Sequence, residues 1–168
     1  MRSETGNLWI SVLMVLILTA LPSCVKNTDD LEREEAASVQ AYLNANPSID
    51  FELKESGLYY YEVQTGSGVS PVSLDTVYAY YTVKLLNGSD LYSNAETDDT
   101  LRFTVNDGYV IKGLDEGIMY MKEGGKSILL IPSKLAYGAT GDYYYIGGYT
   151  PLLFEVELLR VKKGSGSK

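Results

Sequence analysis

Apolar positions along the chain follow successive patterns that predict different kinds of structure. In residues 29–45 they recur at helical spacing, and Asn46-Pro47 ends the pattern. From Gly57 onward, β-branched and aromatic runs alternate with Gly, Asn and Asp, as in strands joined by turns. We expect strands near 58–64, 74–86, 101–104, 126–132 and 151–162.

A second helical pattern interrupts these strands. Leu114, Ile118 and Met121 stand at i, i+4 and i+7, which gives one apolar face. One short helix among about five strands predicts the α+β class, with a curved antiparallel sheet wrapped over the helix. Asn87-Gly88 predicts a tight turn.

The first helix has a signal for its start. Asp29 and Glu32 have the spacing of a capping box, with aspartate in place of the usual serine or threonine. The helix is expected to serve as a spacer or to pack on the main domain. Nothing in its composition supports a catalytic role.

The apolar stretch at residues 8–21 has the length of a signal-peptide core and is short for a ~30 Å hydrocarbon layer. It ends in Leu21-Pro22-Ser23-Cys24, which resembles a bacterial lipobox. We expect a lipoprotein signal peptide over 1–23 and a lipid on Cys24 that anchors the chain in a membrane. An ordinary cleaved signal and an uncleaved anchor are the alternatives.

The expected location is therefore the cell envelope, lipid-anchored at the outer membrane, on its periplasmic or surface face. Acidic residues dominate the segment behind Cys24, including Asp29, Asp30 and Glu32. Such a run suits a solvated tether, and it also resembles the surface-export signal of Bacteroidetes lipoproteins.

Composition excludes several classes of function. The formal net charge is −8, so the basic surface that nucleic-acid binding requires is missing. The chain has no histidine, which removes Ser–His–Asp chemistry and most zinc and copper sites. We expect no metal and no cofactor. The length of 168 residues suits one domain with an appendage.

Several motifs stand in a fixed order within the strand-rich stretch. Residues 109–117 read YVIKGLDEG, residues 131–138 read IPSKLAYG, and residues 152–159 read LLFEVELL. Tyr80-Tyr81-Thr82 precedes them on an expected strand. Together they resemble the FKBP family over about 100 residues, from Gly57 to Val161. The resemblance implies an FKBP-like sheet and helix, a shallow apolar cleft, and peptidyl-prolyl cis-trans isomerase activity without metal or cofactor.

These boundaries divide the chain into four parts. They are a signal peptide (1–23), an acidic tether with a short helix (24–56), the FKBP-type domain (57–163) and a flexible tail (164–168). The expected partners are proline-containing unfolded or peptide substrates and the membrane, with no nucleic acid. We expect a monomer, since the arm before the domain is short.

The resemblance also implies which residues act in the cleft. Ile111 would offer its backbone N–H, and Tyr137 its phenolic O–H, to a substrate carbonyl. The substrate pocket would be lined by Tyr81, Leu91, Tyr92, Phe103, Val110, Leu114, Tyr145, Ile146 and Phe154. Each of these could instead serve packing alone, and Tyr137 could simply cap a turn. Asp115-Glu116 resemble an acid–base pair, but acids suit the first turn of a helix.

Some residues depart from the family pattern. Leu114 stands where the family has tryptophan, Leu91 where it has phenylalanine, and Tyr92 where it has aspartate. These changes favour a weaker enzyme, or a chaperone-like protein-binding module, as the alternative function. The adjacent tyrosines 143–145 would also suit a glycan-binding surface, although nothing fixes a sugar geometry.

Overall fold

The computed structural model describes residues 27–95 and 97–164. The expected signal peptide, Cys24 and the last residues of the tail lie outside the described residues. Within the described part of the chain, no helix has both the length and the apolar character needed to span a membrane.

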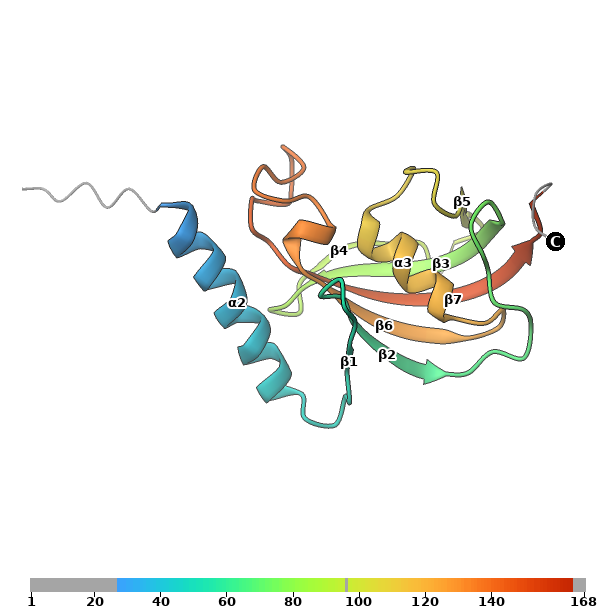
Figure 1. Cartoon of the computed structure of the whole chain (residues 1–168), viewed down its shortest axis with the longest axis horizontal. Helices are drawn as coiled ribbons and strands as arrows, with labels where there is room; N and C mark the ends of the chain where they lie inside the picture. The colour runs from blue at the N-terminus through green and yellow to red at the C-terminus, as the bar shows by residue number, and fades with distance from the viewer. Residues whose placement is uncertain (1–26, 96, 165–168) are drawn as a thin grey trace, which may run out of the picture.

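One curved sheet of antiparallel strands forms the body of the molecule (Figure 1). Its strand order is β1-β2-β6-β7-β3-β4, and β5 pairs with the other part of β3. The strands are β1 (Glu52–Leu53), β2 (Tyr59–Gln64), β3 (Thr76–Leu85), β4 (Asp90–Ser93), β5 (Leu101–Thr104), β6 (Lys126–Ile131) and β7 (Leu152–Lys162). The helical elements are α2 (Thr28–Ala45), α3 (Lys112–Tyr120) and the short 3-10 helix η2 (Ser133–Leu135).

The predicted strands and both helices are confirmed, and the sheet gains β1 and β4. Both residues of β1 are exposed, so this strand carries no alternation of buried and exposed positions that a pattern could reveal. The strand β4 is short, largely exposed and partly polar. It follows the predicted turn at Asn87-Gly88, where Gly88 has a φ of +88°. The sheet therefore begins before the expected domain boundary at Gly57.

The main core lies between the sheet and α3. Leu129 and Ile131 on β6 are fully buried and face this helix. A Cβ atom on Gly113 would collide with the Ile131 side chain, and one on Gly117 with Leu129. These two glycines let α3 lie directly on the sheet.

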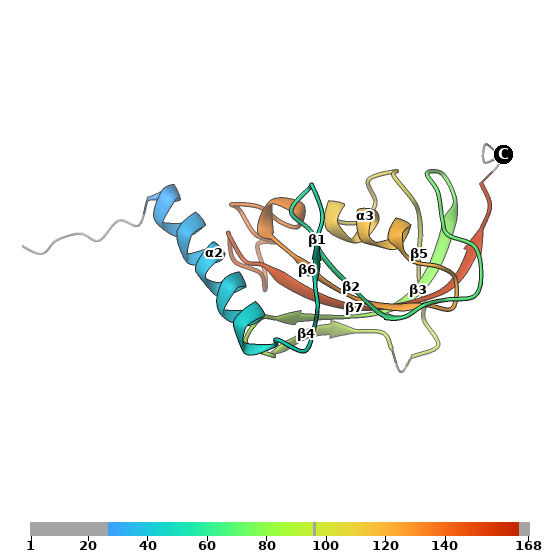
Figure 2. The ribbon, with the colours of Figure 1, turned by 60° about the horizontal axis from the view of Figure 1, so that its bottom comes forward.

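The helix α2 packs on the opposite face of the sheet, at the end away from the C-terminus (Figure 2). Its Val39 is buried against Leu130 of β6 and Leu153 of β7. Since successive strand residues point to opposite faces, Leu129 and Leu130 serve the two separate cores. The expectation that this helix packs on the domain agrees with these contacts.

The start of α2 differs from the prediction. The N-cap is Asn27, whose side-chain oxygen accepts a hydrogen bond from the backbone N–H of Asp30 at 2.8 Å. The predicted capping box of Asp29 and Glu32 is wrong, because Asp29 already lies inside the helix. Asparagine is as good an N-cap as aspartate, so Asn27 can cap the helix two residues before Asp29.

Candidate functional site

A cleft of about 720 Å³ lies between the start of α3 and one end of the sheet. Every predicted cleft residue except Phe103 lines it. Val83, Leu101, Gly108, Tyr109 and Asp142 line it as well, although the sequence did not single them out. Val83 could have been found because it stands two residues after Tyr81 on the same strand face.

Phe103 lies in the main core. Its side chain is only 4% exposed and belongs to the cluster that contains Leu114 and Phe154. On β5 it pairs with Val77 of β3, whose side chain is fully buried. Phe103 thus packs beside the cleft residues Leu114 and Phe154 without being among the residues that line the cleft, and its role in the cleft stays a prediction.

Ile111 occupies the N-cap position of α3, with φ −61° and ψ 147°. Its carbonyl accepts hydrogen bonds from the N–H groups of Leu114 and Asp115, each at 3.1 Å. Among the described residues, no group accepts a hydrogen bond from the N–H of Ile111. Since Ile111 also lines the cleft, this donor is available to a bound carbonyl.

Asp115 and Glu116 are engaged in structural contacts and do not line the cleft. Both carboxylate oxygens of Asp115 accept from the backbone N–H of Asn106, at 2.9 and 3.0 Å. Asn106 has a left-handed φ of +63°, and this contact holds the loop before α3 in place. Burial raises the pKa of Asp115, while the hydrogen bond from Asn106 opposes that rise. Glu116 accepts from Ser56 and Tyr120.

Tyr137 lines the cleft from the segment that follows η2, and 40% of its surface is exposed. Burial, and then the charge of Asp142, raise the pKa of its phenol above 10.0. The phenol therefore keeps its proton at neutral pH and can act as a hydrogen-bond donor.

Three aromatic rings form one wall of the cleft. Tyr81 stacks on Phe154 with ring centroids 5.9 Å apart, and Tyr92 lies against Tyr81 at 5.2 Å. Burial and the neighbouring Tyr92 raise the pKa of Tyr81 to about 12. Tyr92 thus extends the aromatic wall at the position where the family resemblance implied a carboxylate.

Asp142 organises the loop over the cleft. Its Oδ1 accepts hydrogen bonds from the N–H groups of Tyr144, Tyr145 and Ile146, at 2.7–2.9 Å. The hydrogen bond from the N–H of Ile146, followed by those from Tyr144 and Tyr145, lowers the pKa of the Asp142 carboxyl. The turn buries Ile146, and it leaves the side chains of Tyr143, Tyr144 and Tyr145 85–86% exposed. The signal for Asp142 was its place just before the tyrosines, where aspartate commonly starts a turn.

The order and geometry of these residues match a known family. A family model described as FKBP-type peptidyl-prolyl cis-trans isomerase matches residues 68–159, more than half of the chain. The chain belongs to the FKBP-type peptidyl-prolyl cis-trans isomerase family.

Relatives of this isomerase support the assignment over the whole domain. It is 43% identical over 105 residues to the FK506-binding protein of Neisseria meningitidis serogroup B, covering 62% of this chain and 96% of that protein. The crystal structure of a peptidyl-prolyl isomerase from Pseudomonas syringae matches with a TM-score of 0.70 and 28% identity, over 82% of this chain and 98% of that one. FkpA from Escherichia coli matches with a TM-score of 0.69 and 28% identity, over 96% and 75%. The predicted FKBP-like fold is confirmed.

The cleft of this FKBP-type isomerase combines apolar walls with neutral hydrogen-bond donors. The Ile111 N–H and the Tyr137 O–H are available on its surface, and the charge of Asp142 is engaged by its own loop. Such a surface suits a reaction that needs no nucleophile and no transfer of a proton.

Proposed function

We propose that this isomerase uses the cleft to twist the peptide bond before proline in exported polypeptides. Amide resonance opposes the twist with a barrier of ~18–20 kcal/mol. The twisted amide is less polar than the planar one, so an apolar cleft disfavours the planar form more. The observation that carries the proposal is the convergence of Ile111 and Tyr137, two neutral donors, on one apolar cleft.

In this proposal Leu114 forms the floor, and the ring of Tyr81 forms one wall. Leu114 is apolar and lines the cleft, so a proline ring placed on it would be removed from water. The Tyr137 hydroxyl and the Ile111 N–H hold a substrate carbonyl while the bond turns. Both donors are neutral at pH 7, because the Ile111 N–H is a backbone amide and because burial and the charge of Asp142 keep the proton on Tyr137.

A protease-free assay with a tetrapeptide that contains Xaa-Pro tests the proposal. We expect the rate constant of cis-to-trans exchange to rise linearly with protein concentration, with kcat/KM of at least ~10⁴ M⁻¹s⁻¹. An unchanged rate at every protein concentration would contradict the proposal.

The alternative is a protein-binding module with little catalysis. The exposed side chains of Tyr143, Tyr144 and Tyr145 favour it, since tyrosine offers large contact area at low entropic cost. The smaller floor at Leu114 favours it too. Tight binding of the same tetrapeptide, without acceleration of its cis-to-trans exchange, would support this alternative.

We further propose that the isomerase is held at the outer membrane by a lipid on Cys24. The apolar segment before it ends directly at the only cysteine of the chain, in a lipobox-like sequence. Cells fed a labelled fatty acid should label the wild-type protein and leave the Cys24→Ser variant unlabelled. Equal labelling of both proteins would disprove the anchor.

A further inference from the structure

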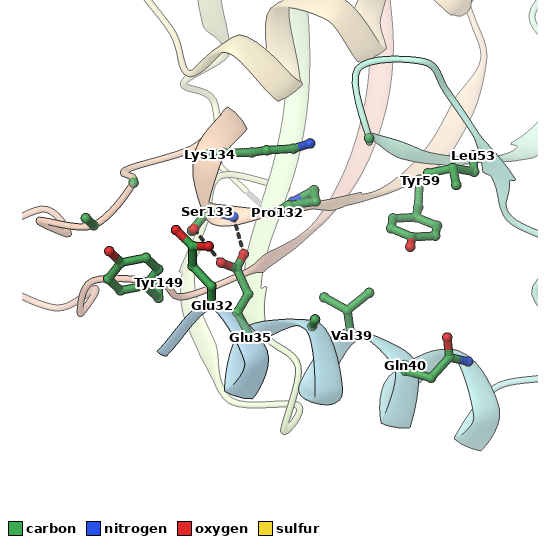
Figure 3. Close-up of a pocket in the computed structure, with 14 residues that line it drawn as sticks. Glu32, Glu35, Val39, Gln40, Leu53, Tyr59, Pro132, Ser133, Lys134 and Tyr149 are labelled. Atoms are coloured by element: carbon green, nitrogen blue, oxygen red, sulfur yellow. Dashed lines mark hydrogen bonds between the residues drawn. The ribbon is translucent and has the colours of Figure 1, made fainter. Parts of the chain in front are cut away.

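Glu35 connects α2 to the segment that carries Tyr137. One carboxylate oxygen of Glu35 accepts from the backbone N–H of Ser133, and the other from its hydroxyl, both at 2.6 Å. Figure 3 shows the Glu35 side chain reaching from the helix to Ser133. The two residues are 98 positions apart in the sequence, so this contact joins the arm to the isomerase domain.

Ser133 in turn holds the backbone on both sides of Tyr137. It is only 4% exposed, and its carbonyl accepts from the N–H groups of Ala136 and Gly138, each at 2.8 Å. Gly138 has a φ of +64°, and its carbonyl accepts from the N–H of Tyr149 at 2.9 Å. A shift of Ser133 would therefore move the residues that flank Tyr137.

We propose that Glu35 is a positioning residue for the isomerase site. By fixing Ser133, it fixes the turn that aims the Tyr137 hydroxyl into the cleft. The helix α2 is thereby part of the working enzyme in addition to being a tether. This inference rests on the proposed role of Tyr137 as a donor to the substrate.

Attachment of the helix and positioning of the turn are separable in this structure. Val39 packs against Leu130 and Leu153 and holds α2 on the sheet by apolar contact. Glu35 supplies the polar contact to Ser133, whose buried N–H requires a partner. Removing the Glu35 carboxylate should therefore loosen the turn while the helix stays docked.

A double-mutant cycle tests the inference, measured on the full chain well below its melting temperature. We expect Glu35→Ala to lower kcat/KM about five- to tenfold. The loss should fall mainly on kcat, because the misplaced Tyr137 hydroxyl would bind the substrate carbonyl less well in the transition state. In the Tyr137→Phe background the same change should lower kcat/KM less than about twofold, since the effects of coupled residues are not additive.

Glu32→Ala is the matched control. Glu32 lies one turn earlier on the same helix, is exposed, and lines the same pocket between α2 and Ser133 as Glu35 does. Its removal makes the same change in net charge and should leave kcat/KM within about twofold of wild type. An equal loss in Glu32→Ala and Glu35→Ala would overturn the inference.

The amide NMR signal of Gly138 gives a second readout. We expect it to shift in Glu35→Ala and to stay in place in Glu32→Ala. Additive losses in the cycle, with an active wild-type protein, would overturn the inference alone. An inactive wild-type protein would overturn the proposed function and this inference together.

Discussion

Replacing Tyr137 with phenylalanine is expected to lower kcat/KM for proline isomerisation about tenfold. The change removes one hydroxyl and keeps the ring, so the apolar surface of the cleft is preserved. A neutral hydrogen bond contributes about 0.5–1.5 kcal/mol, and 1.36 kcal/mol in a barrier is a tenfold change in rate. The measurement is the rate of cis-to-trans exchange in an Xaa-Pro tetrapeptide.

Tyr61→Phe is the control for this prediction. Tyr61 lies on β2, and its ring packs edge-on against Phe51 outside the cleft. The Tyr61→Phe variant also loses a tyrosine hydroxyl and should keep the wild-type rate of proline isomerisation. If Tyr137→Phe is as active as Tyr61→Phe, the phenol makes no contact with the reacting amide.

Gly141→Ala is expected to destabilise the protein by about 3 kcal/mol or more and to abolish most activity. Gly141 has a φ of +74°, where a side chain costs roughly 1–2 kcal/mol. A Cβ at this position would also collide with the carbonyl of Ile146. That collision is with backbone, so no side chain can turn aside to relieve it. Thermal unfolding should show a melting temperature lower by roughly 10 °C.

Gly88→Ala separates the effect of backbone strain from the effect of the collision. Gly88 has a φ of +88°, and a Cβ there would meet nothing within 4 Å. This variant carries the backbone strain without the collision, and Gly88 lies in the turn after β3. We expect the free energy of unfolding to fall by about 1–2 kcal/mol while the activity stays unchanged. Equal stability and activity in the two variants would show that the loop of Gly141 can rearrange freely.

Local patterns determined most of the secondary structure. The β-branched and aromatic runs of β3 and β7, the periodic spacing of Leu114 and Ile118, and the stop at Asn46-Pro47 depend on neighbours in the sequence. Such signals are strong wherever one face of an element is buried. They failed at β1 and β4, because short exposed strands have no buried face to impose a pattern.

The motifs also determined the membership of the cleft. Tyr137, Ile111 and Leu114 lie in conspicuous local sequences, and their order along the chain indicated one shared site. The surroundings of Phe103 depend on the pairing of β5 with β3, which no short segment encodes. Tyr92 was identified as a departure, but its packing on Tyr81 depends on the hairpin that joins β3 to β4.

By itself, then, the sequence determined both helices, most of the strands and the family, since these depend on residue order over short spans. Only the tertiary structure decided which distant groups meet. In the folded chain Glu35 accepts hydrogen bonds from Ser133, and the carboxylate of Asp115 accepts from the N–H of Asn106. The N–H of Ile111 has no acceptor among the described residues. These contacts depend on how the sheet curves and where the two helices rest on it, and that geometry arises only when the whole core packs.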